Sequence, residues 1–137
     1  MAGIIKRLSR ADGVSVNAPS PLIPTSTQVD FTVNNNQSSA QTISGLSFSS
    51  SSEISGTFFV DVERYDDADY YREFFRCIAY YDSDASSWVL RSPSEGDESG
   101  ITLSITTAGV LQYTTDNMTG GNYAGSASIA NIVKVTT

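Results

Sequence analysis

The sequence predicts an all-β protein: an antiparallel β-sandwich or jelly-roll-like domain with an extended N-terminal arm. About eight short segments alternate apolar and polar residues with a period of two, at intervals of roughly 8 to 15 residues. Three of the four prolines fall between residues 11 and 27, ahead of the first of these segments. We therefore divide the chain into an arm over residues 1–27 and a β-sandwich domain over residues 28–137.

The arm is expected to be extended because of its prolines, Pro19, Pro21 and Pro24. Proline has no amide N–H and restricts the residue before it to extended backbone, so this segment cannot be a helix or a central strand. Two interpretations remain open: a linker, or a strap laid on a surface.

The first four strands are expected at residues 29–33, 42–48, 57–65 and 71–81. Three asparagines end the first strand, Gly45 bends the second, and the Asp66–Asp69 segment forms the turn between the third and fourth. Residues 67–79 also carry apolar side chains at helical spacing, which makes this segment the one helix candidate. Its aromatic composition and the preceding turn favour a strand.

The remaining strands are expected at residues 87–91, 101–105, 110–115 and 129–135. Pro93 to Gly96 breaks the chain after the first of them. Ala108-Gly109 predicts a hairpin between the next two, since glycine is favoured in tight turns. The last segment alternates apolar and polar residues as a closing strand.

Several of these strands carry large apolar residues on both faces, which is unusual for a half-exposed sheet. A covering loop or scattered exposure would explain the pattern. The alternative is an oligomer interface, where aromatic residues are enriched. The candidate interface residues are Phe59, Phe74, Tyr80, Trp88 and Ile132.

The net charge of −7 divides unevenly along the chain. Lys6, Arg7 and Arg10 give the first ten residues a charge of +3, whereas the other 127 carry 5 basic and 15 acidic residues. The basic end either keeps the arm soluble or binds an acidic surface on a partner. The candidate partner-binding residues are Ile4, Ile5, Lys6, Arg7, Leu8 and Arg10. The acidic balance argues against nucleic acid as a partner, and no apolar run is long enough to cross a membrane.

Composition also excludes several kinds of chemistry. The chain has no histidine, and Cys77 is its only cysteine, so histidine-based triads and zinc sites built from histidine and cysteine are excluded. Two acidic loops, one with Asp66, Asp67 and Asp69 and one around Gly96, are better explained as solvated turns than as calcium sites. We expect no enzymatic activity, no cofactor and no metal. Trp88 with Tyr80 and Tyr81 could form an aromatic platform for sugars, but packing in the core or burial in an interface explains Trp88 at least as well.

The C-terminal third carries a recognisable order of motifs. Gly100–Ser104, then Leu111–Asn117, then Thr119-Gly120 and a final strand at 128–137 resemble a small β-domain of tailed-bacteriophage virion proteins. The likeness covers roughly residues 28–137 and is motif-like only over about 98–118. The crowded segment at residues 65–76 departs from the family, which has a plainer turn there.

The resemblance implies a structural part of a virion, located in the virion after assembly in the host cytoplasm. It favours a capsid decoration or cement protein that binds the major capsid protein, or other virion proteins, through the arm and an oligomer face. A homo-oligomer, trimer or dimer, is expected. The alternatives are a head-fibre, tail-fibre or baseplate component and, from another class, a carbohydrate-binding module that takes a host glycan.

Overall fold

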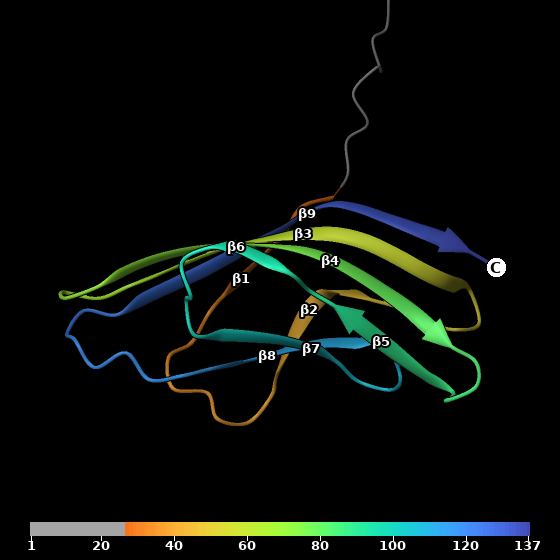
Figure 1. The fold of residues 1–137 in the computed structure, drawn as a ribbon, viewed down its shortest axis with the longest axis horizontal. Helices are drawn as coiled ribbons and strands as arrows, with labels where there is room; N and C mark the ends of the chain where they lie inside the picture. Colours follow the sequence, from red (N-terminus) through yellow and green to blue (C-terminus); the bar gives the residue numbers. More distant parts are fainter. Residues whose placement is uncertain (1–26) are drawn as a thin grey trace, which may run out of the picture.

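Two antiparallel sheets face each other in the computed structural model, which describes residues 27–137 (Figure 1). The larger sheet has the order β1 (Val29–Thr32), β9 (Ala124–Thr136), β3 (Glu53–Tyr65), β4 (Tyr70–Asp82) and β5 (Ser87–Arg91), with β6 (Ser94–Gly96) also paired to β4. The smaller sheet has the order β2 (Gln41–Ser47), β8 (Val110–Thr115) and β7 (Ile101–Ile105). Residues 27–137 contain strands, turns and loops but no helix, and so no helix that is long and apolar enough to cross a membrane. The predicted all-β antiparallel sandwich is confirmed.

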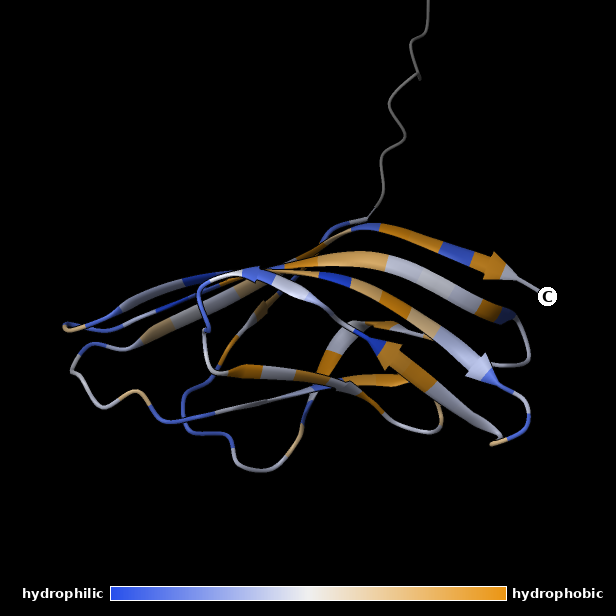
Figure 2. Ribbon diagram, in the orientation of Figure 1, coloured by the Kyte–Doolittle hydropathy of each residue, from blue (hydrophilic) through white to orange (hydrophobic). Residues whose placement is uncertain are grey.

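The period of two decides which side chains enter the core. In β3, Phe58, Val60 and Val62 are buried between the sheets, whereas Phe59 and Asp61 point to the other side. The hydropathy colouring shows apolar stretches on the strands of both sheets (Figure 2). Because the smaller sheet covers only one side, the larger sheet keeps an outer face without a covering layer among the described residues.

The middle of the core is an aromatic cluster that joins the sheets. The ring of Phe48, which follows β2, lies 6.2 Å from Phe58 and 5.1 Å from Trp88, measured between centroids. Gly56 faces the Phe48 ring so closely that a Cβ atom would overlap it. A side chain at position 56 would therefore displace the Phe48 ring from this place in the core.

Two of the expected turns are present as tight hairpins. The Asp66 amide donates to the Asp69 carbonyl at 2.9 Å and closes the β3–β4 hairpin. The β7–β8 hairpin turns at Gly109, whose φ of 95° is a left-handed conformation that glycine adopts at no steric cost. The segment that had both a helical and a strand pattern is β4, so the strand prediction there is confirmed.

Three differences from the sequence prediction concern strand ends. Residues 94–96, expected to be a break, form β6 against Phe74 and Phe75 of β4. Strands β3 and β9 begin at Glu53 and Ala124, four and five residues earlier than the alternation indicated. These added residues are mostly small or polar, and each set is held as strand by backbone pairing with the far end of the other strand: residues 53–56 with 134–136, and residues 124–128 with 61–65.

Candidate interaction surface

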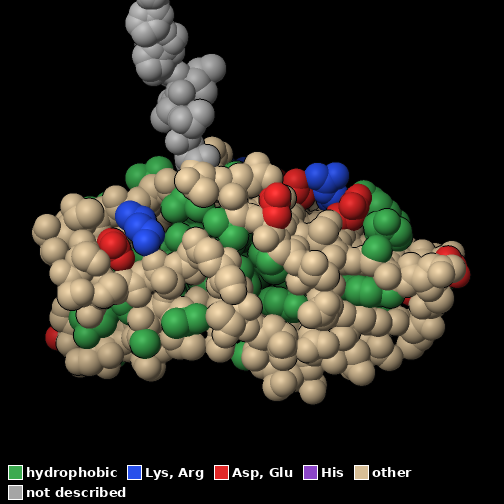
Figure 3. Space-filling model, turned by 180° about the vertical axis from the view of Figure 1, so that it is seen from behind, with side chains coloured by type: hydrophobic (Ala, Val, Ile, Leu, Met, Phe, Trp, Pro, Cys, Tyr) green, Lys and Arg blue, Asp and Glu red, His purple; other side chains and the backbone are tan. Residues whose placement is uncertain are grey.

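The outer face of the larger sheet is the candidate functional site. It consists of the outward side chains of β3, β4, β5 and β9, and it has a charged and aromatic half toward the β3–β4 hairpin and an apolar half toward the C-terminus. Figure 3 shows acidic, basic and hydrophobic side chains gathered together along the upper margin of the molecule.

Two phenylalanines form the centre of this outer face. Phe59 of β3 and Phe74 of β4 lie diagonally across the strand pair, with ring centroids 5.5 Å apart. Phe74 is 36% exposed. A hollow of about 410 Å³ lies over these rings and is bordered by Gln28, Asp61 and Asn131 among others.

Arginine and carboxylate side chains alternate around the two rings. The Arg72 guanidinium donates from Nε and Nη2 to both carboxylate oxygens of Asp61, at 3.0 and 2.7 Å. These bonds raise the pKa of Arg72 above its usual range. Arg76 pairs with Glu95 of β6 at 3.2 Å. Because both arginines are already paired, the charges cancel locally and the face can approach another protein surface without net repulsion.

Arginines are concentrated on this face. Residues 27–137 contain five basic residues, and Arg72, Arg76 and Arg91 all have outward positions on β4 or β5, given the pairing of Arg91 with Ile78. Arg64 is buried, and Lys134 donates to the Ser47 carbonyl at 2.7 Å. Arginine and aromatic residues are the types most enriched at protein interfaces.

The other half of the face is apolar across neighbouring strands. Ile78 of β4 is 42% exposed, and Val133 of β9 is 58% exposed. Thr57 of β3 pairs with Ile78 on one side and with Val133 on the other, so it lies between them in the sheet. Val135, also on β9, is 47% exposed. Burying this apolar surface against a partner would be favourable, since each Å² removed from water contributes about 25 cal/mol.

The structure brings three of the five predicted interface residues together. Phe59, Phe74 and Tyr80 all lie on this outer face. Ile132 does not: it packs partly buried against the core and lines a groove between β1, β2 and β9. The reason is an extra residue in β9 at Asn131 (φ 54°), which reverses the alternation beyond it.

Trp88 is a correction to the sequence prediction. Its side chain is only 3% exposed and packs on Phe48 and, edge to face, on Tyr81 at 5.8 Å. The position of β5 in the sheet points it inward, so it is neither a surface interface residue nor part of an exposed sugar platform. Cys77 is buried as expected, and burial raises the pKa of its thiol to about 12.

The six partner-binding residues predicted in the arm, from Ile4 to Arg10, lie outside the described residues. The two acidic loops lie within them. The Asp66 carboxylate accepts the amides of Asp69, Ala68 and Gly120, which lowers its pKa. Asp97 accepts the Arg72 amide at 2.9 Å. No group of three or more metal-binding side chains is assembled within residues 27–137.

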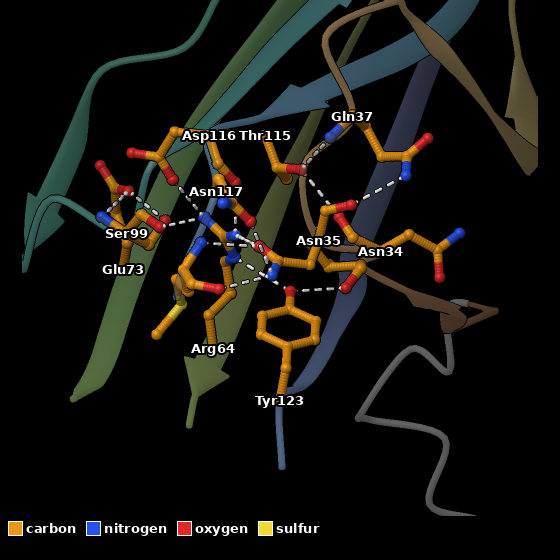
Figure 4. Close-up of polar contacts among 12 residues, drawn as sticks. Asn34, Asn35, Gln37, Arg64, Glu73, Ser99, Thr115, Asp116, Asn117 and Tyr123 are labelled. Carbon is orange, nitrogen blue, oxygen red and sulfur yellow. Dashed lines mark hydrogen bonds and ion pairs between the residues drawn. The ribbon is translucent and has the colours of Figure 1, made fainter. Parts of the chain in front are cut away.

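Sequence reasoning missed a buried polar network beneath the β3–β4 hairpin (Figure 4). Arg64 is fully buried and donates to Tyr123 Oη at 3.0 Å, Asn35 Oδ1 at 3.0 Å and the Asp116 carboxylate at 2.9 Å. Further bonds go to the backbone carbonyls of Asp116 and Ser99. The signal was available: Arg64 has the same parity as Phe58, Val60 and Val62, so it had to point inward.

Glu73 is a second buried charge of this network. It accepts hydrogen bonds from the amide and hydroxyl of Ser99, at 3.0 and 2.7 Å, and from the Ser94 hydroxyl at 2.6 Å. Glu73 and Asp116 also line an open hollow of about 520 Å³ together with Glu98. The bonds of Glu73 and Asp116 to Ser99 and Arg64 give both carboxylates a structural role.

The fold is similar to that of a solved phage protein, the Acinetobacter phage vB_ApiP_P1 tailspike protein. The match covers 99% of this chain and 28% of the tailspike chain, with a TM-score of 0.53 and 18% sequence identity. This chain thus corresponds in extent to little more than a quarter of that chain, and at this identity the similarity is one of fold. No protein-family model matches the sequence, and no curated protein matches it.

Proposed function

We propose that this protein is a structural component of a bacteriophage particle, that its place is in the tail, and that it acts through protein–protein contacts. The observation that carries the proposal is the similarity in fold to a phage tailspike protein, which extends over 99% of this chain. The resemblance of residues 98–118 to a β-domain of phage virion proteins supports it from the sequence.

The chemistry of the described residues supports contacts instead of catalysis. A general acid or base needs a side chain free to exchange a proton with a substrate. Glu73 is held by three hydrogen bonds, and Asp61 and Asp116 are paired with arginines. We therefore propose a protein without enzymatic activity and without a cofactor.

The proposed contact surface is the outer face of the larger sheet. Its apolar half, with Ile78 and Val133, would be buried in a homo-oligomer or against another virion protein. The paired arginines of the other half would surround that contact as a polar rim, the arrangement typical of protein interfaces.

A capsid decoration protein is the second candidate. It is favoured by the sequence resemblance and by the basic, proline-containing arm, which suits attachment to a shell. A carbohydrate-binding module is less well supported, because the burial of Trp88 removes the central ring of the expected sugar platform. We expect a glycan array to show no binding.

Gold-labelled antibodies against the protein, applied to intact phage particles and viewed by electron microscopy, test the proposal. Labelling of the tail is the expected result. Labelling of the head would overturn the tail assignment in favour of decoration, and absence of the protein from purified particles would overturn the structural role itself.

A further inference from the structure

The outer face of the larger sheet has a column of large side chains on one side of β3 and a column of small ones on the other. The outward column on β4, which we name the ridge, consists of Tyr70, Arg72, Phe74, Arg76, Ile78 and Tyr80. The outward column on β9 beside residues 59–65, which we name the trough, consists of Ala124, Ser126, Ser128 and Ala130. The hollow of about 410 Å³ over Phe59 and Phe74 lies along the trough, because Ser128 and Ala130 border it and are too small to fill it.

The ridge and the trough lie one strand away from β3 on opposite sides, since β3 pairs with both β4 and β9. A second copy rotated by half a turn about an axis along β3 would place its ridge over this trough and its trough over this ridge. Aligned sheets pack face to face in this manner about 10 Å apart. The face is therefore complementary in shape to itself, as a two-fold contact between identical chains requires.

The strand register places one ring at the hollow in this arrangement. Asp61 pairs with Phe74 on one side and with Ser128 on the other, so Phe74 and Ser128 lie at the same height along the strands. The rotation brings the Phe74 ring of the second copy, 36% exposed in the single chain, over Ser128 and into the hollow. A cavity of about 150 Å³ is enough to hold a benzene ring, so the hollow has room for it.

We propose that the outer face of the larger sheet binds a second copy of this chain about this axis, with the strands of the two copies parallel and Phe74 of each copy in the hollow of the other. The proposal rests on the contact surface named under the proposed function and identifies its partner as an identical chain. The role in a phage particle does not depend on it, so gold labelling of particles and the tests in solution can fail separately.

The apolar half of the face fits the same rotation. Thr57 pairs with Ile78 and with Val133, so Val133 of each copy faces Ile78 of the other. Both side chains are exposed in the single chain, at 58% for Val133 and 42% for Ile78. This contact removes apolar surface from water on both copies, which favours association.

The charged half is complementary as well. Glu63 pairs with Arg72 and with Ser126, so the Arg72 guanidinium of each copy lies over Ser126 of the other, next to that copy's Glu63. Opposite charges thus meet across the contact twice. Asp61 lies on the axis, where its own Arg72, 2.7 Å away, compensates its charge.

The extent of the face suits a stable dimer. Strands β3, β4 and β9 have 13 residues each, so together they form a face about 43 Å long and about 14 Å wide. Two copies would cover about 1,200 Å² in all, the lower end of the range for stable protein interfaces. Within residues 27–137, the exposed large hydrophobic residues all lie on these three strands: Ile54, Tyr65, Tyr70, Phe74, Ile78, Val133 and Val135.

A pair of complementary variants tests the contact between Phe74 and Ser128. Ser128→Phe fills the hollow, and Phe74→Ser removes the ring that enters it. We expect each variant alone to self-associate at least about tenfold more weakly than the wild type by sedimentation equilibrium, because the contact occurs twice in the dimer. An equimolar mixture should associate within about threefold of the wild type, since each contact in the mixed dimer again joins one phenylalanine to one serine.

Ser128→Ala is the matched control. It removes the hydroxyl that donates to Asp30 without adding a ring, and it should associate like the wild type. The fluorescence of buried Trp88 reports whether each variant is folded. A mixture that associates no better than the single variants would overturn the proposed contact. A trimeric wild type would overturn the two-fold axis, and a monomeric one would leave the face to a different protein.

A spin label on Ala68→Cys, at the turn of the β3–β4 hairpin, tests the orientation of the two copies. Cys77 takes no label, since it is buried with a thiol pKa of about 12. Parallel strands bring the two hairpin turns together, so double electron–electron resonance should give a distance below about 30 Å between labels on sheets about 10 Å apart. Antiparallel packing would separate the turns by about 40 Å or more, the length of these strands, and a distance of that size would overturn the proposal.

Discussion

Arg64 connects four parts of the chain that are distant in sequence. Its guanidinium reaches Asn35, Ser99, Asp116 and Tyr123, which lie on the loops around the β3–β4 hairpin. Asp116 is 71% exposed in its side chain, so the ion pair by itself contributes little. The stabilisation comes from satisfying several acceptors that would otherwise be buried without a donor.

Replacing Arg64 with methionine keeps most of the volume and removes every donor. We expect the free energy of unfolding to fall by about 3 kcal/mol, because several buried acceptors lose their partners. Urea unfolding followed by Trp88 fluorescence measures the change. The control is Arg76→Met. Because the Arg76 side chain is exposed, this change should lower the free energy of unfolding by no more than about 0.5 kcal/mol. A loss for Arg64→Met no larger than that of the control would contradict this role.

At the scale of the element, the carboxylates of Asp66 and Asp67 tie the β3–β4 hairpin to the 117–123 loop, and that of Asp66 binds it through the Gly120 amide. Asp66 accepts the amides of Ala68 and Asp69 through Oδ1 and that of Gly120 through Oδ2 at 2.7 Å. These bonds, the one from Asp69 first, lower its pKa in the folded protein. The unfolded chain has the ordinary value, so the stabilisation is present above that value and is lost as the pH falls through the folded one.

We therefore expect Asp66→Asn to destabilise the protein at pH 7 and to match the wild type more closely as the pH falls below about 4. The amide of asparagine cannot accept the Gly120 N–H through its nitrogen, and it does not titrate. Urea midpoints between pH 7 and pH 2.5 measure the difference. An Asp84→Asn control in the exposed β4–β5 turn should show no such convergence, and a constant gap for Asp66→Asn would contradict the assignment.

Among residues 27–137, strand β9 has no partner along one edge over part of its length. Strand β1 pairs only with residues 126–129 of β9, whereas β9 continues to Thr136. Two features discourage pairing with another chain there: the bulge at Asn131, and Lys134, which turns inward to Ser47 and lies 5.0 Å from the Phe48 ring centroid. Inward charges and bulges are common protections of sheet edges.

Lys134→Thr should expose an uncharged, β-prone edge and promote association through β9. We expect a concentration-dependent rise in mass by sedimentation velocity. Lys134→Arg keeps the charge at the same edge position and should leave the mass unchanged. An equal rise in mass for the two variants would contradict a protective role of the charge.

At the scale of the whole molecule, the outer face of the larger sheet predicts self-association. We expect a mass above the 14.7 kDa of one chain in multi-angle light scattering. Val133→Asp places a charge in the apolar half and should shift the protein to single chains, since burying an unpaired carboxylate is costly. Thr102→Asp on the smaller sheet is the control. A wild type that is monomeric throughout would contradict the homo-oligomer.

Much of the fold was predictable because its signals are local. The alternation in β3, the Asp66–Asp69 turn and the glycine turn at residue 109 each depend on a few neighbouring residues. Strand β6 and the early parts of β3 and β9 were missed because their pairing, and not their own composition, makes them strands. Phe59, Phe74 and Tyr80 were identified as surface candidates, but the hollow between Gln28 and Phe74 was not, since it joins segments far apart in the chain.

An antiparallel β-protein, the places of most of its strands and the lack of histidine-based sites can be read from the amino-acid sequence alone, because these follow from periodicity, turn residues and residue types. The packing of the two sheets settles which apolar residues are covered. It buried Trp88, turned Ile132 inward beyond a bulge, gave Arg64 its partners and left Phe59 and Phe74 on an open face. Each of these outcomes depends on which strands pair and on which side the second sheet packs, and no local pattern encodes that choice.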